Sequence, residues 1–300
     1  MRALFVLTPA ESKRLIGKAV SNLPEVKHAQ KNDHLLISHG STNVYVTEEI
    51  LGKDKTAALF DRNTFLSGLV VRGTLCSTYA KEKGPILLMK NGKIEPPAPN
   101  MSEMLQDFGK DSVFLKGASA VDVKGNAAVF MAHPEGGTIG WGIGTILARG
   151  IRLIVPVGLE KLVASVEQSV GSCGQQTFDY CQGLKVGMMP LSGAKVITEI
   201  DALKILTGVE CIHVASGGSS GTEGAVVLVA EGEKEVVETA IRVVESVKGE
   251  PPLKPRKGVC EICGVSSPAQ GSDYKTEGLL KRCPYEKMTE VELPEYLKDR

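Results

Sequence analysis

Polar side chains follow a short apolar run at residues 113–115, where a ligand could approach the backbone. The run predicts a buried strand, and the small residues after it would leave space beside the strand end. In open α/β sheets, ligands bind outside the carboxyl ends of the strands, so a lysine, a hydroxyl and a carboxylate there could hold an anion and move a proton. The ligand-binding candidates are Lys116, Gly117, Ser119 and Asn126, and the catalytic candidate is Asp122.

A glycine-rich stretch at residues 136–144 carries no charged side chain and precedes an apolar run at 151–157. We expect a helix entrance here, followed by a second buried strand. Amide groups at a helix start, with the helix dipole behind them, suit a phosphate, a carboxylate or an oxyanion. We expect ligand contacts from Gly136, Gly137 and Thr138, and catalytic chemistry from His133 and Glu135. Alternatively, the glycines only allow a helix to pack closely on the sheet.

A Gly-Ser-Thr turn at residues 40–42 lies between an apolar strand at 34–38 and a predicted helix at 46–51. Hydroxyl groups and backbone donors at a helix N-terminus bind phosphate, and we assign this role to Gly40, Ser41, Thr42 and Asn43. The alternative is that Ser41 or Thr42 is an ordinary helix cap. His39 is an acid–base candidate because its ordinary pKa lies near neutrality, although a lone histidine can equally be a polar core or surface residue.

Lys161 follows the second predicted strand, in the segment Gly-Leu-Glu-Lys-Leu-Val at residues 158–163. A lysine at that strand end could hold a phosphate or a carboxylate of the ligand. The alternative is a surface lysine at the start of a helix over residues 159–170.

The cysteines near the C-terminus have the spacing of metal ligands. Cys260 and Cys263 form a Cys-x-x-Cys turn, which presents two thiolates to one metal, and Cys283 would be a third ligand. No cysteine or histidine follows Cys283, so a fourth ligand must come from elsewhere. We expect zinc at these residues, with an iron–sulfur cluster as the alternative metal group and a tail with incidental thiols as the alternative without metal.

The elements around these residues divide the chain into three predicted parts. Residues 1–7 predict a strand, followed by an amphipathic helix. Residues 193–247 carry the pattern strand, helix, strand, strand, helix, and a proline-rich linker begins at residue 250. The expected parts are residues 1–190 with an α/β fold, residues 191–250 with a ferredoxin-like βαββα fold, and residues 251–300 as a linker and cysteine-containing tail.

Residues 117–126, Gly-Ala-Ser-Ala-Val-Asp-Val-Lys-Gly-Asn, are followed by a Gly-Gly loop and by Arg-Gly-Ile-Arg-Leu-Ile-Val at 149–155. This combination resembles the second half of a class I CoA-transferase subunit, and its first part is similar to a stretch of ribose-5-phosphate isomerase. The resemblance spans about residues 10–185 and implies the Rossmann-like α/β core of the sugar-isomerase and CoA-transferase superfamily. It further implies that the Gly-Ser-Thr turn binds a phosphate, that Lys161 corresponds to a lysine of the isomerase, and that two copies pair as a homodimer.

Two departures from these families leave the reaction open. No Glu-Asn-Gly-like turn precedes the Gly-Ala stretch, where a class I CoA-transferase carries its nucleophilic glutamate. Ser119 and Ala120 stand where the isomerase has acidic residues, so a general base for enediol chemistry is missing there. We therefore expect a small-molecule-binding protein that acts as an enzyme on a phosphorylated or CoA-linked metabolite. The alternative is a catalytically inactive ligand sensor or assembly protein with the same fold.

The composition argues against several function classes. Lysine and arginine together number 35, as do aspartate and glutamate, so the formal net charge is zero and neither a nucleic acid nor a membrane is an expected partner. No run of about 18 apolar residues predicts a membrane span. The seven cysteines, without a predicted secretion signal, favour the reducing cytoplasm over a disulfide framework.

Overall fold

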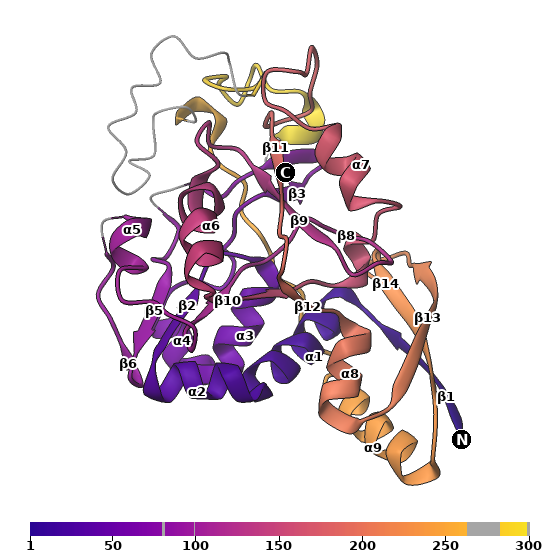
Figure 1. Ribbon diagram of the computed structural model, residues 1–300. Coiled ribbons are helices and arrows are strands. Elements are labelled where there is room, and N and C mark those ends of the chain that lie inside the picture. The colour runs from indigo at the N-terminus through magenta and orange to yellow at the C-terminus, as the bar shows by residue number, and fades with distance from the viewer. Residues whose placement is uncertain (80–81, 99, 263–282, 299–300) are drawn as a thin grey trace.

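The computed structural model describes residues 1–79, 82–98, 100–262 and 283–298. At its centre lies a six-stranded mixed sheet in the order β12-β10-β7-β2-β5-β6 (Figure 1). The four parallel neighbours are β12 (Lys195–Ile197), β10 (Arg152–Pro156), β7 (Val113–Leu115) and β2 (His34–Ile37). Antiparallel pairing then adds β5 (Leu87–Lys90) and β6 (Lys93–Ile94). The predicted mixed α/β class is therefore confirmed.

Consecutive residues of the central strands face two different cores. In β7, Val113 and Leu115 belong to one buried cluster and Phe114 belongs to another, and β2 and β10 alternate in the same way. Side chains of a strand point alternately to its two faces, so both faces of this sheet are covered. For this reason the strands occur in the sequence as continuous apolar runs.

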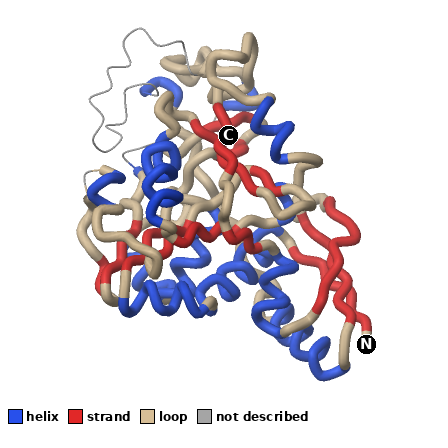
Figure 2. Tube along the Cα trace, in the orientation of Figure 1, coloured by secondary structure: helices blue, strands red, loops and turns tan. Residues whose placement is uncertain are grey.

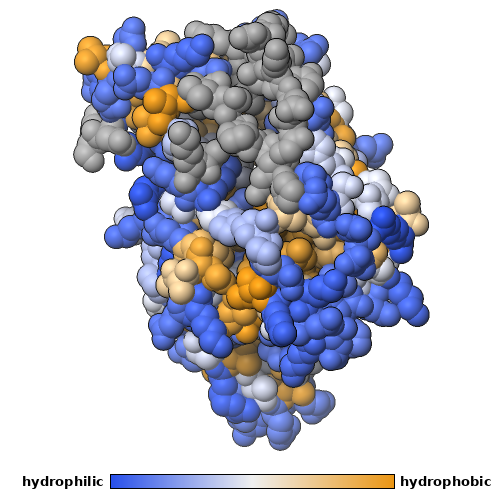
Figure 3. Space-filling model, turned by 90° about the vertical axis from the view of Figure 1, so that its left-hand side faces the viewer, coloured by the Kyte–Doolittle hydropathy of each residue, from blue (hydrophilic) through white to orange (hydrophobic). Residues whose placement is uncertain are grey.

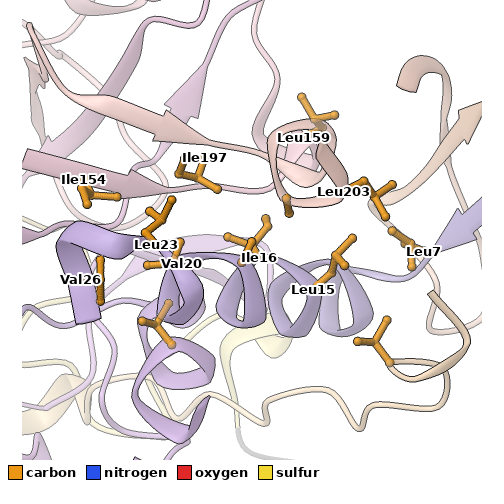
Figure 4. Packing of buried hydrophobic residues seen from close by; sticks show 14 of the residues in the cluster. Leu7, Leu15, Ile16, Val20, Leu23, Val26, Ile154, Leu159, Ile197 and Leu203 are labelled. Carbon is orange, nitrogen blue, oxygen red and sulfur yellow. The ribbon is translucent and has the colours of Figure 1, made fainter. Parts of the chain in front are cut away.

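Helices cover one face of the sheet and lie below it in Figure 2. They are α1 (Pro9–Asn22), α2 (Pro24–Asn32), α3 (Ser41–Leu51), α4 (Lys53–Leu59) and α8 (Glu199–Thr207). A capping box fixes the start of α1, because the side chain of Thr8 accepts from the backbone of Glu11 while the Glu11 carboxylate accepts from the backbone of Thr8. Figure 4 shows Ile16 of α1 pointing up toward the sheet, within the same buried cluster as Ile154 and Ile197.

The opposite face carries two helices and a small antiparallel sheet. The helices α5 (Met101–Met104) and α6 (Gly137–Arg149) pack on Phe114 and Val155 through one buried cluster. The small sheet has the order β11-β9-β8, formed by β8 (Ala120–Val121), β9 (Ala127–Met131) and β11 (Gly187–Pro190). A further helix, α7 (Val166–Gly171), packs against this sheet. The chain between β7 and β10 therefore supplies most of this layer.

A second, three-stranded sheet differs from the predicted ferredoxin-like unit. The predicted strand, helix, strand, strand and helix all form, the last three as β13 (Glu210–Gly217), β14 (Ala225–Glu231) and α9 (Lys234–Glu245). The first of them, β12, joins the central sheet instead, and β1 (Arg2–Leu7) pairs with β14 over all six of its residues. One buried cluster contains Leu7, Ile154 and Val226, so the core continues across the predicted boundary at residue 190.

The outer face of this second sheet is apolar and exposed. Leu4 of β1 lies opposite Val229 of β14, which lies opposite Ile212 of β13. Leu4 and Ile212 are 65% and 67% exposed, whereas Phe5 and Cys211, their neighbours on the other face, are buried. The sheet thus buries one face and presents aliphatic side chains on the other.

Two antiparallel hairpins lie outside the parallel strands of the central sheet. A turn at residues 90–93 joins β5 to β6, and Asn91 and Gly92 have φ angles of 49° and 80°, the left-handed pair that a two-residue hairpin turn prefers. The other hairpin is formed by β3 (Leu69–Val71) and β4 (Thr74–Cys76). Figure 3 views the molecule from the side of β5 and β6, where the surface is mostly hydrophilic with hydrophobic side chains gathered in its middle.

A buried ionic network ties the chain that follows α9 to the core. The Arg14 guanidinium pairs with Glu48, with Glu49 at 2.9 Å and with Glu250 at 2.9 Å. Arg62 adds a second guanidinium, 3.2 Å from Glu48. We call these five residues the Arg14 network. Because each buried charge in it has an opposite charge beside it, the network fixes the predicted linker against α1 and α3.

The C-terminal residues 283–298 form a small cluster of their own, with Tyr285, Leu293 and Leu297 buried together. The C-terminal part of the described chain also contains the short 3-10 helices η3 (Cys260–Ile262) and η4 (Glu295–Leu297). None of the helices in the described ranges is long and apolar enough to cross a membrane.

Candidate functional site

Three chain segments leave neighbouring parallel strands at the same edge of the central sheet. Residues 38–43 follow β2, residues 116–117 follow β7, and the 3-10 helix η2 (Leu159–Lys161) follows β10. A Cβ atom added to Gly117 would lie 3.8 Å from the Cα atom of Gly40, so the first two segments touch. The Asn43 side-chain amide joins them further, donating to the carbonyl oxygens of Ser38 at 2.8 Å and Leu115 at 3.4 Å. This carboxyl edge is the place where α/β sheets bind ligands.

Lys116 is the most buried cation at this edge, with 8% of its surface exposed. Its ammonium group makes no hydrogen bond and no ion pair with any residue in the described ranges, although a buried charge normally has a partner. Burial, together with the charges of the Lys161 and Lys83 ammonium groups, lowers the pKa of Lys116 to about 8. We call Lys83, Lys116 and Lys161 the lysine cluster.

The other two members of the lysine cluster are held by neutral oxygens. The Lys161 Nζ atom donates to the carbonyl oxygen of Ala118 at 2.9 Å, and burial lowers its pKa. The Lys83 Nζ atom donates to the hydroxyl oxygens of Ser67 and Ser77, each at 2.8 Å, and burial lowers its pKa to about 8. Both ammonium groups are thus positioned without being neutralised.

His39 lies beside the lysine cluster and is neutral at physiological pH. Burial lowers its pKa to about 3, and the charges of Lys83 and Lys116 contribute to the same shift. Its Nε2 atom lies 2.7 Å from the carbonyl oxygen of Gly84, which can only accept, so we assign the ring proton to Nε2. The ring also packs on Phe65, with 4.8 Å between centroids. His39 therefore adds a positioned neutral ring to the edge rather than a fourth positive charge.

The N-terminus of α3 opens at the same edge. Its N-cap residue is Gly40, and no side chain caps the helix, so the alternative that Ser41 or Thr42 acts as the cap is not what the structure shows. The first backbone N–H groups of a helix have no partner within it and carry the positive end of the dipole. The Asn43 Oδ1 atom is also buried without a donor. A ligand between α3 and Lys116 would meet polar groups that the protein itself leaves unpaired.

Asp122 and Asn126 lie in the turn between β8 and β9, and the Asp122 carboxylate is fully used there. It accepts from the backbone of Lys124 and Asn126 at 3.0 Å each, and from the Asn126 amide and the Val166 backbone at 3.1 Å each. Burial alone would raise its pKa, but these hydrogen bonds outweigh burial and hold the pKa below its usual value. Ser119 is similarly engaged, because its hydroxyl accepts from the Phe130 backbone at 3.1 Å. This geometry favours structural roles for the three residues.

The predicted residues at the start of α6 form a separate group on the other layer. The Glu135 carboxylate is exposed and accepts from the Trp141 indole at 3.2 Å, while the backbone of Glu135 donates to His133. A Cβ atom on Gly136 would come within 2.8 Å of the Gly140 backbone. The glycines therefore permit a tight approach of the loop to its own helix, and the polar backbone groups of Gly137 and Thr138 lie in the same first turn.

Glu199 is a buried carboxylate that no sequence motif indicates. It is fully buried in the first turn of α8, next to β12, and both of its oxygens accept from the Leu159 backbone, at 2.9 and 3.2 Å. Burial raises its pKa. Beside it, Lys13 pairs with Glu160 at 2.6 Å. These acidic groups stabilise the segment that carries Lys161.

The predicted metal ligands are only partly within the described residues. Cys260 and Cys283 both pack against the small cluster formed by Tyr285, Leu293 and Leu297, whereas Cys263 lies outside the described ranges. Among the residues that the structure describes, no group of three or more metal-ligating side chains is found. Zinc at these cysteines stays a prediction.

A pocket of about 240 Å³ lies between the C-terminal segments and the hairpin of β3 and β4. Its lining includes the basic residues Arg72, Arg256 and Lys257 and the acidic residues Glu82, Glu261 and Glu290. Because the charges balance, the pocket has no clear preference for an anion or a cation. Its lining contains no member of the lysine cluster.

No protein-family model, no curated protein and no solved structure matches the chain.

Proposed function

We propose that the protein binds a small anionic metabolite, phosphorylated or carrying a carboxylate, at the carboxyl edge of the central sheet. The observation that carries this proposal is Lys116, a residue that is 8% exposed and whose ammonium group has no partner among the described residues. Removing a charge from water costs several kcal/mol unless an opposite charge compensates for it. An anionic ligand would supply that charge.

The surroundings of Lys116 favour an anion with more than one negative charge. Lys83 and Lys161 add two ammonium groups, and neither is neutralised by its hydrogen-bond partners. The uncapped N-terminus of α3 adds backbone donors and a partial positive charge on a third side. A phosphate group matches this arrangement better than a single carboxylate, and it occurs in both sugar phosphates and CoA esters. The same arrangement fits the phosphate turn that the superfamily resemblance implies.

A ligand sensor without catalysis is the second candidate, and a specific observation favours it. The Asp122 carboxylate, a catalytic candidate, is occupied by four hydrogen bonds, and Glu135 lies in the other layer at α6. Neither is positioned as a general base at the lysine cluster. If the protein is an enzyme that acts on this metabolite, its chemistry consequently depends on the lysines themselves.

A thermal-shift panel tests the binding proposal and identifies the ligand class. The probes are inorganic phosphate, ribose 5-phosphate, citrate and acetyl-CoA, each against the wild-type protein, Lys116→Met and the control Lys93→Met, which changes an exposed lysine on β6. We expect phosphate-bearing probes to raise the melting temperature of the wild-type protein and the control but not of Lys116→Met. Equal shifts in all three proteins, or no shift in any, would contradict the proposal.

A further inference from the structure

We infer that Lys116 is a nucleophile that forms an imine with a carbonyl carbon of the bound ligand. This inference rests on the proposed function, because it takes the anion-binding edge as given and adds a reaction to it. The ligand class becomes narrower as a result: an aldehyde or ketone that carries a phosphate or carboxylate group.

The hydrogen bonds of the three lysines distinguish Lys116 from the other two. Lys161 is fixed by the carbonyl oxygen of Ala118, and Lys83 is fixed by two serine hydroxyl groups. Lys116 makes no contact of this kind with the described residues and is the most buried of the three. An amine that is to attack a carbon must have its lone pair available, and only Lys116 is both desolvated and unengaged.

The neighbouring charges favour the neutral amine that the attack requires. A lysine is activated as a nucleophile when it is desolvated or lies next to another cationic group, and Lys116 meets both conditions. With its pKa lowered to about 8, roughly a tenth of Lys116 is neutral at pH 7, against less than about a thousandth for an ordinary lysine. Lys83 and Lys161 thus have two effects: they attract the anion, and they favour the neutral amine form of Lys116.

The reaction balances with water as the only other product. The Lys116 nitrogen attacks the carbonyl carbon, a C–N bond forms, and the carbonyl π electrons move to oxygen, which takes up a proton released from the nitrogen. The hydroxyl group of the resulting carbinolamine takes up a proton from solvent and leaves as water, and the nitrogen lone pair completes the C=N bond of a protonated imine. No oxidant or reductant takes part. The protonated imine is a cation beside two ammonium groups, so the ligand's own negative charge is needed to stabilise it.

Reductive trapping tests the inference. Full-length protein is treated with sodium borohydride in the presence of dihydroxyacetone phosphate, pyruvate or dihydroxyacetone, and intact mass and peptide mapping locate any adduct. We expect one reduced adduct on Lys116 with an anionic probe, at a yield at least about tenfold above that with uncharged dihydroxyacetone. An adduct on other lysines, or equal yields with charged and uncharged probes, would overturn the inference.

The variant Lys116→Arg separates the inference from the proposed function, because arginine keeps the positive charge and does not form the imine. We expect it to retain stabilisation by inorganic phosphate and to lose the adduct, while Lys93→Met retains both. If wild-type protein is stabilised by phosphate but gives no adduct, the inference fails and the binding proposal stands. If phosphate has no effect either, the proposed function fails as well. Should Lys116→Arg not fold, peptide mapping of the wild-type adduct decides alone.

Discussion

The Arg14 network and the lysine cluster are both buried groups of charge, but only one of them is paired internally. Arg14 contacts three carboxylates, and its guanidinium also lies 4.8 Å from the ring of Tyr45. Lys116 pairs with none of the described carboxylates, and the charges that shift its pKa are those of two ammonium groups. Paired charge far from a strand end stabilises the fold, whereas unpaired charge at the carboxyl edge points to a ligand. Pairing, rather than burial, distinguishes the two.

The most severe expected effect comes from breaking the paired network. Arg14→Met leaves Glu48 and Glu250 buried next to each other without their main counter-charge. We expect the free energy of unfolding, measured by urea denaturation, to fall by roughly 3–5 kcal/mol. The control Arg2→Met removes an exposed pair with Glu231 and should cost less than about 1 kcal/mol. A cost for Arg14→Met no larger than that of the control would show that the network contributes little to stability.

In the lysine cluster, we expect a substitution to raise the unfolding free energy instead of lowering it. Lys116→Met removes a charge that the fold desolvates without compensation, so we expect the unfolding free energy at pH 7 to rise by roughly 1–3 kcal/mol. The native pKa of about 8 lies below that of the unfolded chain, so the destabilisation is present below pH 8. It disappears as the pH rises from about 8 toward 10, and the advantage of the variant disappears with it. A variant that is less stable than wild type at pH 7 would contradict this account.

Asp122 gives a further test of the difference between paired and unpaired groups. In Asp122→Asn, one carboxylate oxygen becomes an amide nitrogen that donates instead of accepting, so two of the four hydrogen bonds are lost, and we expect a loss of roughly 1–2 kcal/mol of unfolding free energy with unchanged phosphate binding. The same carboxylate contributes stability above its unfolded pKa, and this contribution should be lost as the pH falls through its lowered native pKa. The exposed Asp111→Asn serves as control. Normal stability with lost phosphate binding would instead support the catalytic or binding role predicted from the sequence.

The smallest expected effect is proton uptake when an anion binds. At pH 8 Lys116 and Lys83 are each partly neutral, and a bound anion raises their pKa values by favouring the charged form. Titration calorimetry with sulfate, in two buffers of different ionisation enthalpy, should show uptake of roughly half a proton to one proton per site. Sulfate does not titrate in this range, so the protons must bind to the protein. Equal heats in both buffers would mean that the lysines are already fully charged.

The sequence predicted the position of this edge better than its chemistry. His39, Gly40, Lys116 and Lys161 were found because each follows a recognisable apolar strand, and parallel strands end at one edge. Lys83 precedes an antiparallel strand, and its arrival beside Lys116 depends on the pairing of β5 with β2, which no local pattern specifies. A lysine beside an apolar run can be assigned to the ligand-binding edge only when the order of the strands in the sheet is known.

The role of Asp122 depends on a tertiary contact in the same way. The Asp122 carboxylate follows a strand, as a catalytic residue would, but whether its oxygens face a ligand or the Val166 backbone is decided by a tertiary contact with α7. The local sequence also does not specify which strands pair with each other. β12 and β1 were both recognised as strands, but β12 joins β10 in the central sheet, and β14 pairs with β1, 219 residues away at the closest register pair, Leu7 and Val226, as well as with β13, its neighbour in sequence.

The most direct test is the affinity for inorganic phosphate, measured by titration calorimetry for wild-type protein, Lys116→Met and Lys93→Met. If Lys116 compensates the charge of an anionic ligand, wild type and Lys93→Met should bind one phosphate per chain, and Lys116→Met should bind at least about tenfold more weakly, a loss of about 1.4 kcal/mol or more. Binding of equal strength in all three proteins would contradict the assignment of the site to the carboxyl edge at Lys116.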